Sequence, residues 1–193
     1  MKNRPWVIAI EGAECTGKTD LARELAYALQ GSCGLRSVWV SEWLREWCDL
    51  QGRTPRPEQQ WDIAQEQARR IRLACDGHEV VVADTSALMT AVYSELLFND
   101  RSLRAFALAL QRTYAVTLVT ANDVPWVADG LQRDGPHVRE PVRRMLTGLL
   151  EGARIRFDDV SGTGPQRLDR ALSVVTQRLG LGREPRRRLL NRG

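Results

Sequence analysis

The sequence is poor in the features that mark secreted, zinc-binding and membrane proteins. Its four cysteines form no C-x-x-C pair and have no zinc-ligand spacing with the two histidines, so we expect free thiols in a reducing compartment. No apolar run approaches the roughly 20 residues that span a bilayer, and the apolar stretch 7–10 is too short for the core of a signal peptide. These absences predict a soluble, cytoplasmic protein without a membrane partner.

Internal repeats are absent as well, and the only biased stretch is an arginine-rich end. The 28 Lys and Arg residues exceed the 24 Asp and Glu residues by four, and residues 182–193, with five Arg and one Glu, account for the whole excess. The rest of the chain is formally neutral, which does not favour a nucleic-acid partner. We expect one domain over residues 1–181 and a basic, disordered tail over 182–193.

Short apolar runs alternate with amphipathic segments along the chain. Four runs are almost continuously apolar, as expected of parallel strands covered on both faces, and a fifth, more polar run is either an edge strand or a loop. This alternation predicts an α/β fold, a three-layer α/β/α sandwich with a parallel sheet. The predicted strands are 6–10, 37–40, 79–83, 116–120 and, weakly, 155–160, and the predicted helices are 18–29, 57–76, 86–97, 102–112, 140–150 and 165–179.

Residues 12–19 match the complete phosphate-binding (Walker A) pattern G-x-x-x-x-G-K-[ST]. Its glycines let the backbone wrap around phosphates, Lys18 reaches the β- and γ-phosphates of ATP, and the Thr19 hydroxyl coordinates Mg²⁺. A glycine turn with an incidental lysine is the alternative, but a predicted strand precedes the pattern and a predicted helix follows it. The residues assigned to the nucleotide are Gly12, Glu14, Cys15, Thr16, Gly17, Lys18 and Thr19.

A second marker is the run Val-Val-Val-Ala-Asp at 80–84. It is typical of a buried strand that delivers Asp84 to the carboxyl edge of the sheet, where ligands of open α/β folds bind. There Asp84 would hold Mg²⁺ through water, together with Thr19. The alternative is that Asp84 caps the next helix, since Asp-Thr-Ser also suits a helix N-cap.

The segment after the second strand, 41–47, suits the acceptor of a phosphoryl group. If it is helical, Glu42, Arg45 and Glu46 lie on one face, so that a glutamate could accept a hydroxyl proton while the arginine offsets charge. An ordinary solvated salt-bridge face is the alternative. Trp43 and Trp126 are candidates for stacking on an aromatic ring or, equally, core aromatics.

The longest irregular segment, 122–139, is polar and has the character of a lid. Arginines in a lid would close over the phosphates and exclude water. Within and beyond this segment they are Arg133, Arg139, Arg143 and Arg144, although the last two are also compatible with simple exposure.

Several motifs together resemble the nicotinamide riboside kinase domain of NadR-type bacterial proteins, over about residues 6–179. The most specific are E-x-x-R-E at 42–46 and W-V-x-D-G at 126–130. They occur in this order with Ile-Ala-Ile-Glu-Gly at 8–12, Ile-Ala-Gln-Glu-Gln at 63–67 and Val-Ala-Asp-Thr at 82–85.

This resemblance implies a nucleoside-monophosphate-kinase-like P-loop fold and an enzyme of NAD biosynthesis. Such a kinase phosphorylates the ribose 5′-hydroxyl of nicotinamide riboside, a small nucleoside-like substrate, with ATP and Mg²⁺. The catalytic residues assigned on this basis are Lys18, Glu42, Asp84 and Arg133, and the implied substrate-binding residues are Glu42, Arg45, Glu46 and Asp129. The stacking candidates Trp43 and Trp126 complete the predicted substrate site.

The resemblance has two departures. The family often carries a second aspartate two residues after the first, where this chain has Ser86, and its fuller members carry a DNA-binding segment and an adenylyltransferase domain before the kinase. We therefore expect a stand-alone kinase domain or an excised fragment. A kinase of another nucleoside or nucleotide, and a regulatory ATPase without an acceptor, remain alternatives. The sequence favours neither ATP nor GTP and assigns no oligomeric state.

Overall fold

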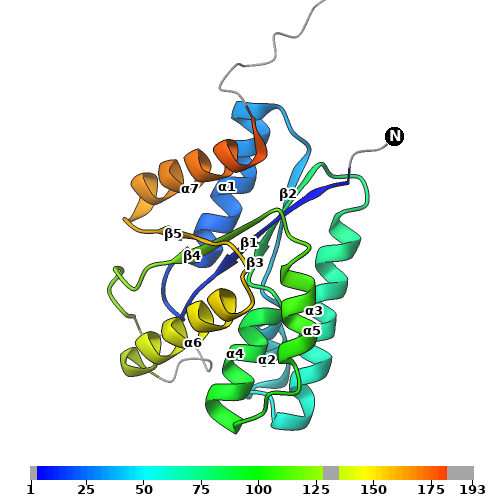
Figure 1. Cartoon of the computed structure of the whole chain (residues 1–193), viewed down its shortest axis with the longest axis vertical. Coiled ribbons are helices and arrows are strands. Elements are labelled where there is room, and N and C mark those ends of the chain that lie inside the picture. Colours follow the sequence, from blue (N-terminus) through cyan, green and yellow to red (C-terminus); the bar gives the residue numbers. More distant parts are fainter. Residues whose placement is uncertain (1–3, 128–134, 182–193) are drawn as a thin grey trace, which may run out of the picture.

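The computed structural model describes residues 4–127 and 135–181, and within them a five-stranded parallel sheet forms the centre of the molecule (Figure 1). The strand order is β2-β3-β1-β4-β5, with every neighbouring pair parallel. The strands are β1 (Trp6–Glu11), β2 (Ser37–Val40), β3 (Val80–Asp84), β4 (Val116–Thr120) and β5 (Asp158–Val160).

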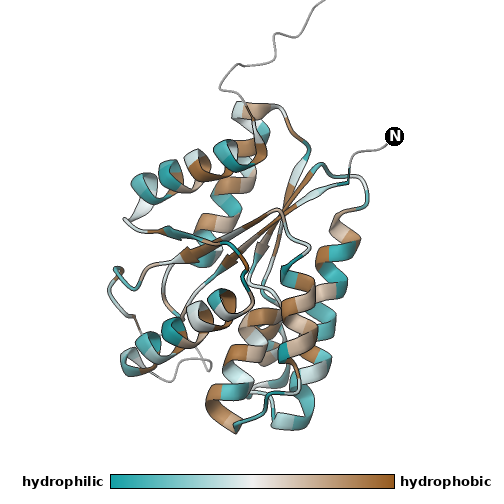
Figure 2. Ribbon diagram, viewed as in Figure 1, coloured by the Kyte–Doolittle hydropathy of each residue, from teal (hydrophilic) through white to brown (hydrophobic). Residues whose placement is uncertain are grey.

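Helices cover both faces of this sheet, as the alternating pattern predicts. One face packs against α1 (Lys18–Cys33) and α7 (Gly164–Leu179), and the other against α3 (Gln60–Ala74), α4 (Ala87–Phe98) and α6 (Arg139–Gly152). Figure 2 shows apolar residues on the strands and on the helix sides turned toward them. Two further helices, α2 (Trp43–Gln51) and α5 (Arg104–Gln111), pack on α3 and α4 respectively. The three-layer α/β/α prediction is confirmed.

The register of the sheet brings the functional ends of the strands together. Ile10 in β1 pairs with Asp84 in β3, and β4 pairs with the other side of β1. The chain leaves β1 toward β2 and β3 on one side and later reaches β4 and β5 on the other. Ligands of open α/β sheets bind outside the carboxyl ends of the strands where the strand order reverses in this way.

The structure refines several predicted boundaries. The helix predicted over 57–76 is divided into a short 3₁₀ turn, η1 (Pro57–Gln59), and α3. The weakly predicted strand 155–160 is the three-residue edge strand β5, which pairs only with β4 among the described strands. A second 3₁₀ turn, η2 (Pro136–Val138), precedes α6. The helix α6 itself begins at Arg139, one residue earlier than predicted.

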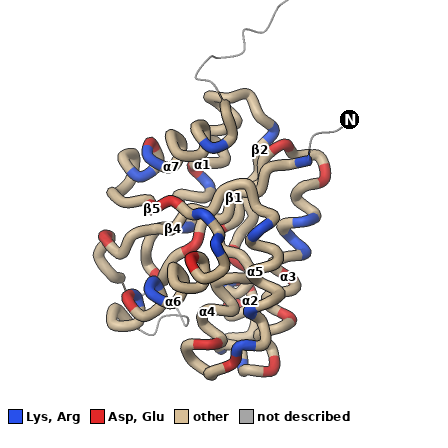
Figure 3. Tube along the Cα trace, in the orientation of Figure 1, with Lys and Arg blue, Asp and Glu red and all other residues tan. Residues whose placement is uncertain are grey.

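Two surface properties agree with the composition. Acidic and basic residues are interspersed along the described chain (Figure 3), and their formal charges balance. Among the described residues, no helix is both long and apolar enough to cross a membrane. The basic segment 182–193 lies outside the described residues.

Candidate active site

The loop between β1 and α1 has the backbone conformation that the phosphate-binding pattern requires. Gly12 has a φ of 148°, and Gly17 caps α1 in the left-handed conformation with a φ of 72°. Added side-chain atoms at Gly12 would meet Thr120 Oγ1 at 2.1 Å, so the backbone passes the end of β4 at a distance that only glycine allows. The glycines of the motif are therefore used for a close approach as well as for the turn.

Thr16 within the loop and two side chains from other elements, Thr120 of β4 and Arg167 of α7, hold this loop in place. Thr16 Oγ1 donates to the Ala13 carbonyl at 2.8 Å and shares a hydrogen bond with Thr120 Oγ1 at 2.7 Å. On the opposite side, Arg167 of α7 is almost fully buried and donates to the Thr16 carbonyl and to Asp123. These bonds fix the carbonyl groups of the loop, and successive N–H groups of such a loop form the concavity that binds an anion.

Lys18 and Thr19 begin α1 at the floor of the same loop. The Lys18 ammonium donates to the Ala13 carbonyl at 2.7 Å and lines the pocket. Thr19 also lines the pocket, and its hydroxyl donates a hydrogen bond to Asp84. The two residues predicted to hold a metal are thus in contact although 65 positions separate them.

Asp84 is the last residue of β3 and is 1% exposed. Burial raises the pKa of its carboxyl, while the charge of Lys18 and the hydrogen bond from Thr19 oppose that rise. Its Oδ1 atom accepts no hydrogen bond within the described residues. A buried carboxylate oxygen beside a threonine hydroxyl fits a magnesium ion that keeps several waters and uses few protein ligands. The alternative role as a helix cap is excluded, because Ser86 accepts the capping bond from Leu88 N.

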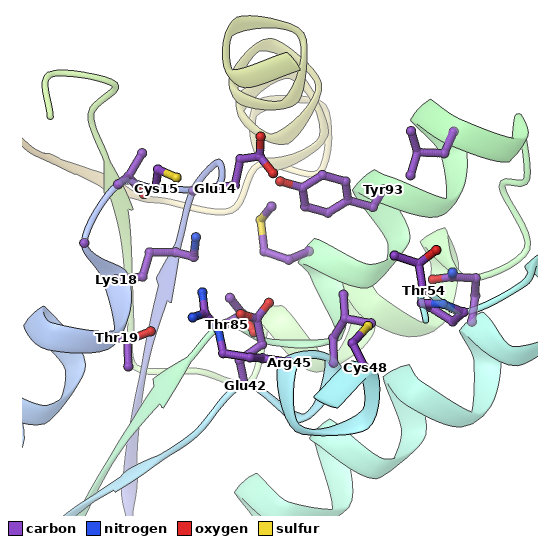
Figure 4. A pocket seen from close by; sticks show the side chains of 18 of the residues that line it. Glu14, Cys15, Lys18, Thr19, Glu42, Arg45, Cys48, Thr54, Thr85 and Tyr93 are labelled. Atoms are coloured by element: carbon purple, nitrogen blue, oxygen red, sulfur yellow. The ribbon is translucent and has the colours of Figure 1, made fainter. Parts of the chain in front are cut away.

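One pocket of about 360 Å³ joins the phosphate loop to the predicted acceptor segment. Glu42 is the N-cap of α2, and both Glu42 and Arg45 line this pocket with Lys18 and Thr19. Figure 4 shows Lys18 and Thr19 on one side of the pocket and Thr54 on the other. The charge of Arg45 also acts on Asp84. The structure therefore brings the phosphate loop together with Glu42 and Arg45, two of the three residues of the predicted acceptor cluster.

Two predicted acceptor residues do not line this pocket. Glu46 accepts hydrogen bonds from Ser41 and, at 2.7 Å, from Arg70 of α3. Trp43 lies under the same arginine, with its ring centroid 4.0 Å from the guanidinium carbon, and its backbone N–H donates to Gln67. Arg70 thus engages both side chains away from the pocket. The prediction that Glu42, Arg45 and Glu46 share one face toward the acceptor is therefore wrong for Glu46, which bonds to Ser41 and Arg70 instead.

The far wall of the pocket consists of residues that the sequence reasoning missed. They come from α4, from α2, and from the segment before α3 together with the first residue of α3. The sequence of α4 is apolar almost all round, so its periodicity marks no binding face. The missed residues are Leu44, Cys48, Thr54, Pro55, Gln60, Met89, Tyr93, Leu97 and Phe98.

The described ends of the predicted lid approach Glu14 of the phosphate loop. Trp126 Nε1 donates to Glu14 Oε1 at 3.4 Å, and the backbone N–H of Gly135 donates to the same oxygen at 3.2 Å. Trp126 does not line the pocket itself. Asp129 and Arg133, the predicted lid residues, lie outside the described residues.

The arginines after the predicted lid have different surroundings. Arg139 is buried at the start of α6 and donates to the Val124 carbonyl at 2.8 Å. Arg143 donates to the Thr120 carbonyl and to Asp159, so it joins the ends of β4 and β5. Arg144 is mostly exposed. None of these three lines the pocket.

Comparison with known proteins agrees with this architecture. A family model described as an AAA domain matches residues 7–167. No curated protein sequence matches the chain. The fold is similar to a crystal structure of NadR protein in complex with NAD and AMP-PNP, with a TM-score of 0.73 and 17% identity over 94% of this chain and 52% of that one.

Two further solved structures are similar. One is NadR protein in complex with NR, with a TM-score of 0.72, 18% identity and coverage of 95% of this chain and 54% of that chain. The other is thymidylate kinase from Ehrlichia chaffeensis, with a TM-score of 0.64, 14% identity and coverage of 91% and 98%. The chain spans about half the length of the two NadR structures. The predicted NadR-type, kinase-like P-loop fold is confirmed.

Proposed function

The chain belongs to the AAA domain family, and from this premise we propose that it is an ATP-dependent kinase that phosphorylates nicotinamide riboside. The proposal assigns ATP to the phosphate loop and the nucleoside to the remainder of the pocket. The product would be nicotinamide mononucleotide, which places the reaction in NAD biosynthesis. The similarity in fold to NadR bound to NR supports this choice of acceptor.

The observation that carries the proposal is that Lys18 and Thr19 share one pocket with Glu42 and Arg45. A nucleotide-binding switch needs the first pair only. The pocket volume of about 360 Å³ is also in the range of small-molecule sites. A site with phosphate-binding groups at one end and a carboxylate and a guanidinium beside them supports transfer of a phosphoryl group to a bound hydroxyl.

In the proposed reaction the ribose 5′-oxygen attacks the γ-phosphorus of ATP, and the bond between this phosphorus and the β–γ bridging oxygen breaks. Glu42 accepts the hydroxyl proton, and ADP leaves. Lys18 and Arg45 stabilise the negative charge on the transferring group. Thr19 and Asp84 would hold Mg²⁺, which neutralises phosphate charge and orients the phosphates when bound.

The wall of the pocket supports an acceptor with a cationic ring. Nicotinamide riboside carries a positively charged pyridinium, which carboxylates, aromatic faces and polarisable sulfur attract. Glu14, Glu42, Tyr93 and Met89 line the pocket and provide these groups. In Figure 4 the carboxyl group of Glu14 points toward Tyr93. We assign to Tyr93 the stacking role for which Trp43 and Trp126 were the candidates in the sequence.

The test is a substrate panel with purified protein, ATP and Mg²⁺. We expect a higher kcat/KM for nicotinamide riboside than for uridine, cytidine, adenosine or a nucleoside monophosphate. Preference for a neutral nucleoside would refute nicotinamide riboside as the acceptor and leave the assignment as a kinase standing. ATP hydrolysis that no acceptor stimulates would refute the kinase and support a regulatory ATPase. Lys18→Ala serves as the negative control for contaminating kinases.

A further inference from the structure

A buried carboxyl group lies directly behind the phosphate loop and has no role in the proposed chemistry. Glu11 is the last residue of β1 and is 0% exposed. Its Oε1 atom lies 2.5 Å from Ser86 Oγ, and its Oε2 accepts the Ser86 N–H at 3.3 Å. Glu11 therefore joins the start of the phosphate loop to the residue that caps α4, across 75 positions of sequence.

The hydrogen bonds of Ser86 indicate whether the Glu11 carboxyl group is protonated. Ser86 Oγ accepts the Leu88 N–H at 3.1 Å and lies 2.9 Å from Gln111 Oε1. Gln111 in turn donates its Nε2 to Thr117 Oγ1 at 2.9 Å, so its carbonyl oxygen is the atom that faces Ser86. One hydroxyl hydrogen cannot serve both Gln111 Oε1 and an ionised Glu11.

If Glu11 is protonated, both short contacts of Ser86 Oγ, with Glu11 Oε1 and with Gln111 Oε1, are hydrogen bonds. Glu11 then donates to Ser86 Oγ, and Ser86 donates to Gln111. If Glu11 ionises, Ser86 must turn its hydrogen toward the carboxylate, and the buried Gln111 carbonyl loses its donor unless the amide rotates. A buried polar group without its hydrogen bond is costly, so the arrangement favours the neutral acid.

The charges around Glu11 agree with this assignment. Burial raises the pKa of Glu11 from 4.5 to about 7, and the hydrogen bonds from Ser86 and the charge of Lys18 only partly oppose the rise. The Lys18 ammonium is itself bonded to the Ala13 carbonyl. Tyr114, before β4, is the other titratable group that Glu11 influences: burial, and then the charge of Glu11, raise the pKa of its phenol.

We propose that Glu11 is a positioning residue that acts as a neutral carboxylic acid, and that the hydrogen bond it donates to Ser86 holds the 84–86 turn and α4 against the phosphate loop. This turn contains Asp84, and its Thr85 has a left-handed φ of 66°. The helix that follows carries Met89 and Tyr93 of the acceptor wall. One proton thus couples the nucleotide side of the pocket to its acceptor side.

Thermal and denaturant unfolding between pH 5 and pH 8 test the protonation without reference to activity. Glu11→Gln retains a donor for Ser86 and cannot ionise, and Glu24→Gln, on the exposed face of α1, is the matched control. Because the folded protein keeps the Glu11 proton that the unfolded chain loses above about pH 4.5, this contribution to stability is lost as pH rises toward 7. Between pH 5 and 7 the folding constant of the wild type should fall by about 40-fold in total relative to Glu11→Gln.

Carbon-13 NMR of labelled glutamate carboxyl groups gives a direct readout. We expect one signal, absent from Glu11→Gln, to titrate well above the ordinary range of a glutamate, because burial raises the pKa of Glu11 to about 7. The proposal would be overturned if the stability of the wild type and of Glu11→Gln changed with pH in parallel. It would also be overturned if the Glu11 signal showed an ionised carboxylate throughout this range. Glu24→Gln should follow the wild type.

The activity arm of the test rests on the proposed function. At pH 6.5, Glu11→Gln should keep kcat/KM for the acceptor within about twofold, whereas Glu11→Leu, which cannot donate to Ser86, should lower it by about tenfold or more. Equal losses in the two variants would refute positioning through this hydrogen bond. If no acceptor is phosphorylated, the proposed function fails, while the stability and NMR measurements still decide the state of Glu11.

Discussion

The close approach of the phosphate loop to β4 makes Gly12→Ala a quantitative test of the site geometry. The new methyl carbon would lie 2.1 Å from Thr120 Oγ1 and 3.3 Å from the Thr120 carbonyl oxygen, at a φ of 148°. Strain at such a backbone conformation costs about 1–3 kcal/mol, and overpacking costs about 1–3 kcal/mol more. We expect the free energy of unfolding to fall by about 2–6 kcal/mol.

A double-mutant cycle separates these two contributions. Thr120→Ala alone removes Oγ1 and with it the hydrogen bonds to Thr16 Oγ1 and the Glu11 carbonyl. In the Gly12→Ala, Thr120→Ala double variant the side-chain clash is gone and the backbone strain remains. The coupling energy should therefore be favourable by about 1–3 kcal/mol.

Chemical denaturation monitored by circular dichroism measures this cycle, and nucleotide titration reports on the loop. Gly31→Ala is the matched control, because an added Cβ meets nothing within 4 Å there and Gly31 lies within α1. It should be neutral or stabilising by up to about 1 kcal/mol. A Gly12→Ala variant as stable as the wild type, with normal nucleotide affinity, would refute the proposed contact with Thr120.

Three further predictions concern activity. Lys18→Ala should lower phosphoryl transfer by orders of magnitude with little change in Tm, and near-normal turnover would exclude its role at the phosphates. Asp84→Asn should weaken the apparent affinity for Mg²⁺, so that added Mg²⁺ partly restores the rate. Glu42→Gln should lower kcat, and added Mg²⁺ should not restore it. The reverse pattern in Mg²⁺ titrations would mean that the two residues have exchanged roles. Tyr93→Ala should raise KM for the acceptor several-fold more than Trp43→Ala does, because of these two residues only Tyr93 lines the pocket. Equal KM values for the two variants would show that the acceptor does not bind against Tyr93.

The phosphate loop and the layer architecture were determined by the sequence itself. The residues of the loop are contiguous, and the strand before it and the helix after it follow from local hydrophobic patterns. The position of Asp84 at the end of a buried strand follows from the same kind of local pattern. Such features are predictable because neighbouring residues specify them.

The acceptor side depended on residues that are distant in sequence. Arg70, 24 positions from Glu46, decides that this glutamate and Trp43 lie away from the pocket. The helix that provides Tyr93 is apolar on nearly all sides, so its binding face exists only once the neighbouring helices are in place. Periodicity along one helix cannot specify a partner on another.

Glu11 is the clearest case of tertiary control. In the sequence it is a single acidic residue between an apolar strand and a glycine loop, where a solvated side chain would be equally compatible. Only the packing of β1 beside β3 and β4 removes it from water and brings Ser86 against it. Burial and the geometry of one hydroxyl group then set its protonation, and neither property is encoded near residue 11.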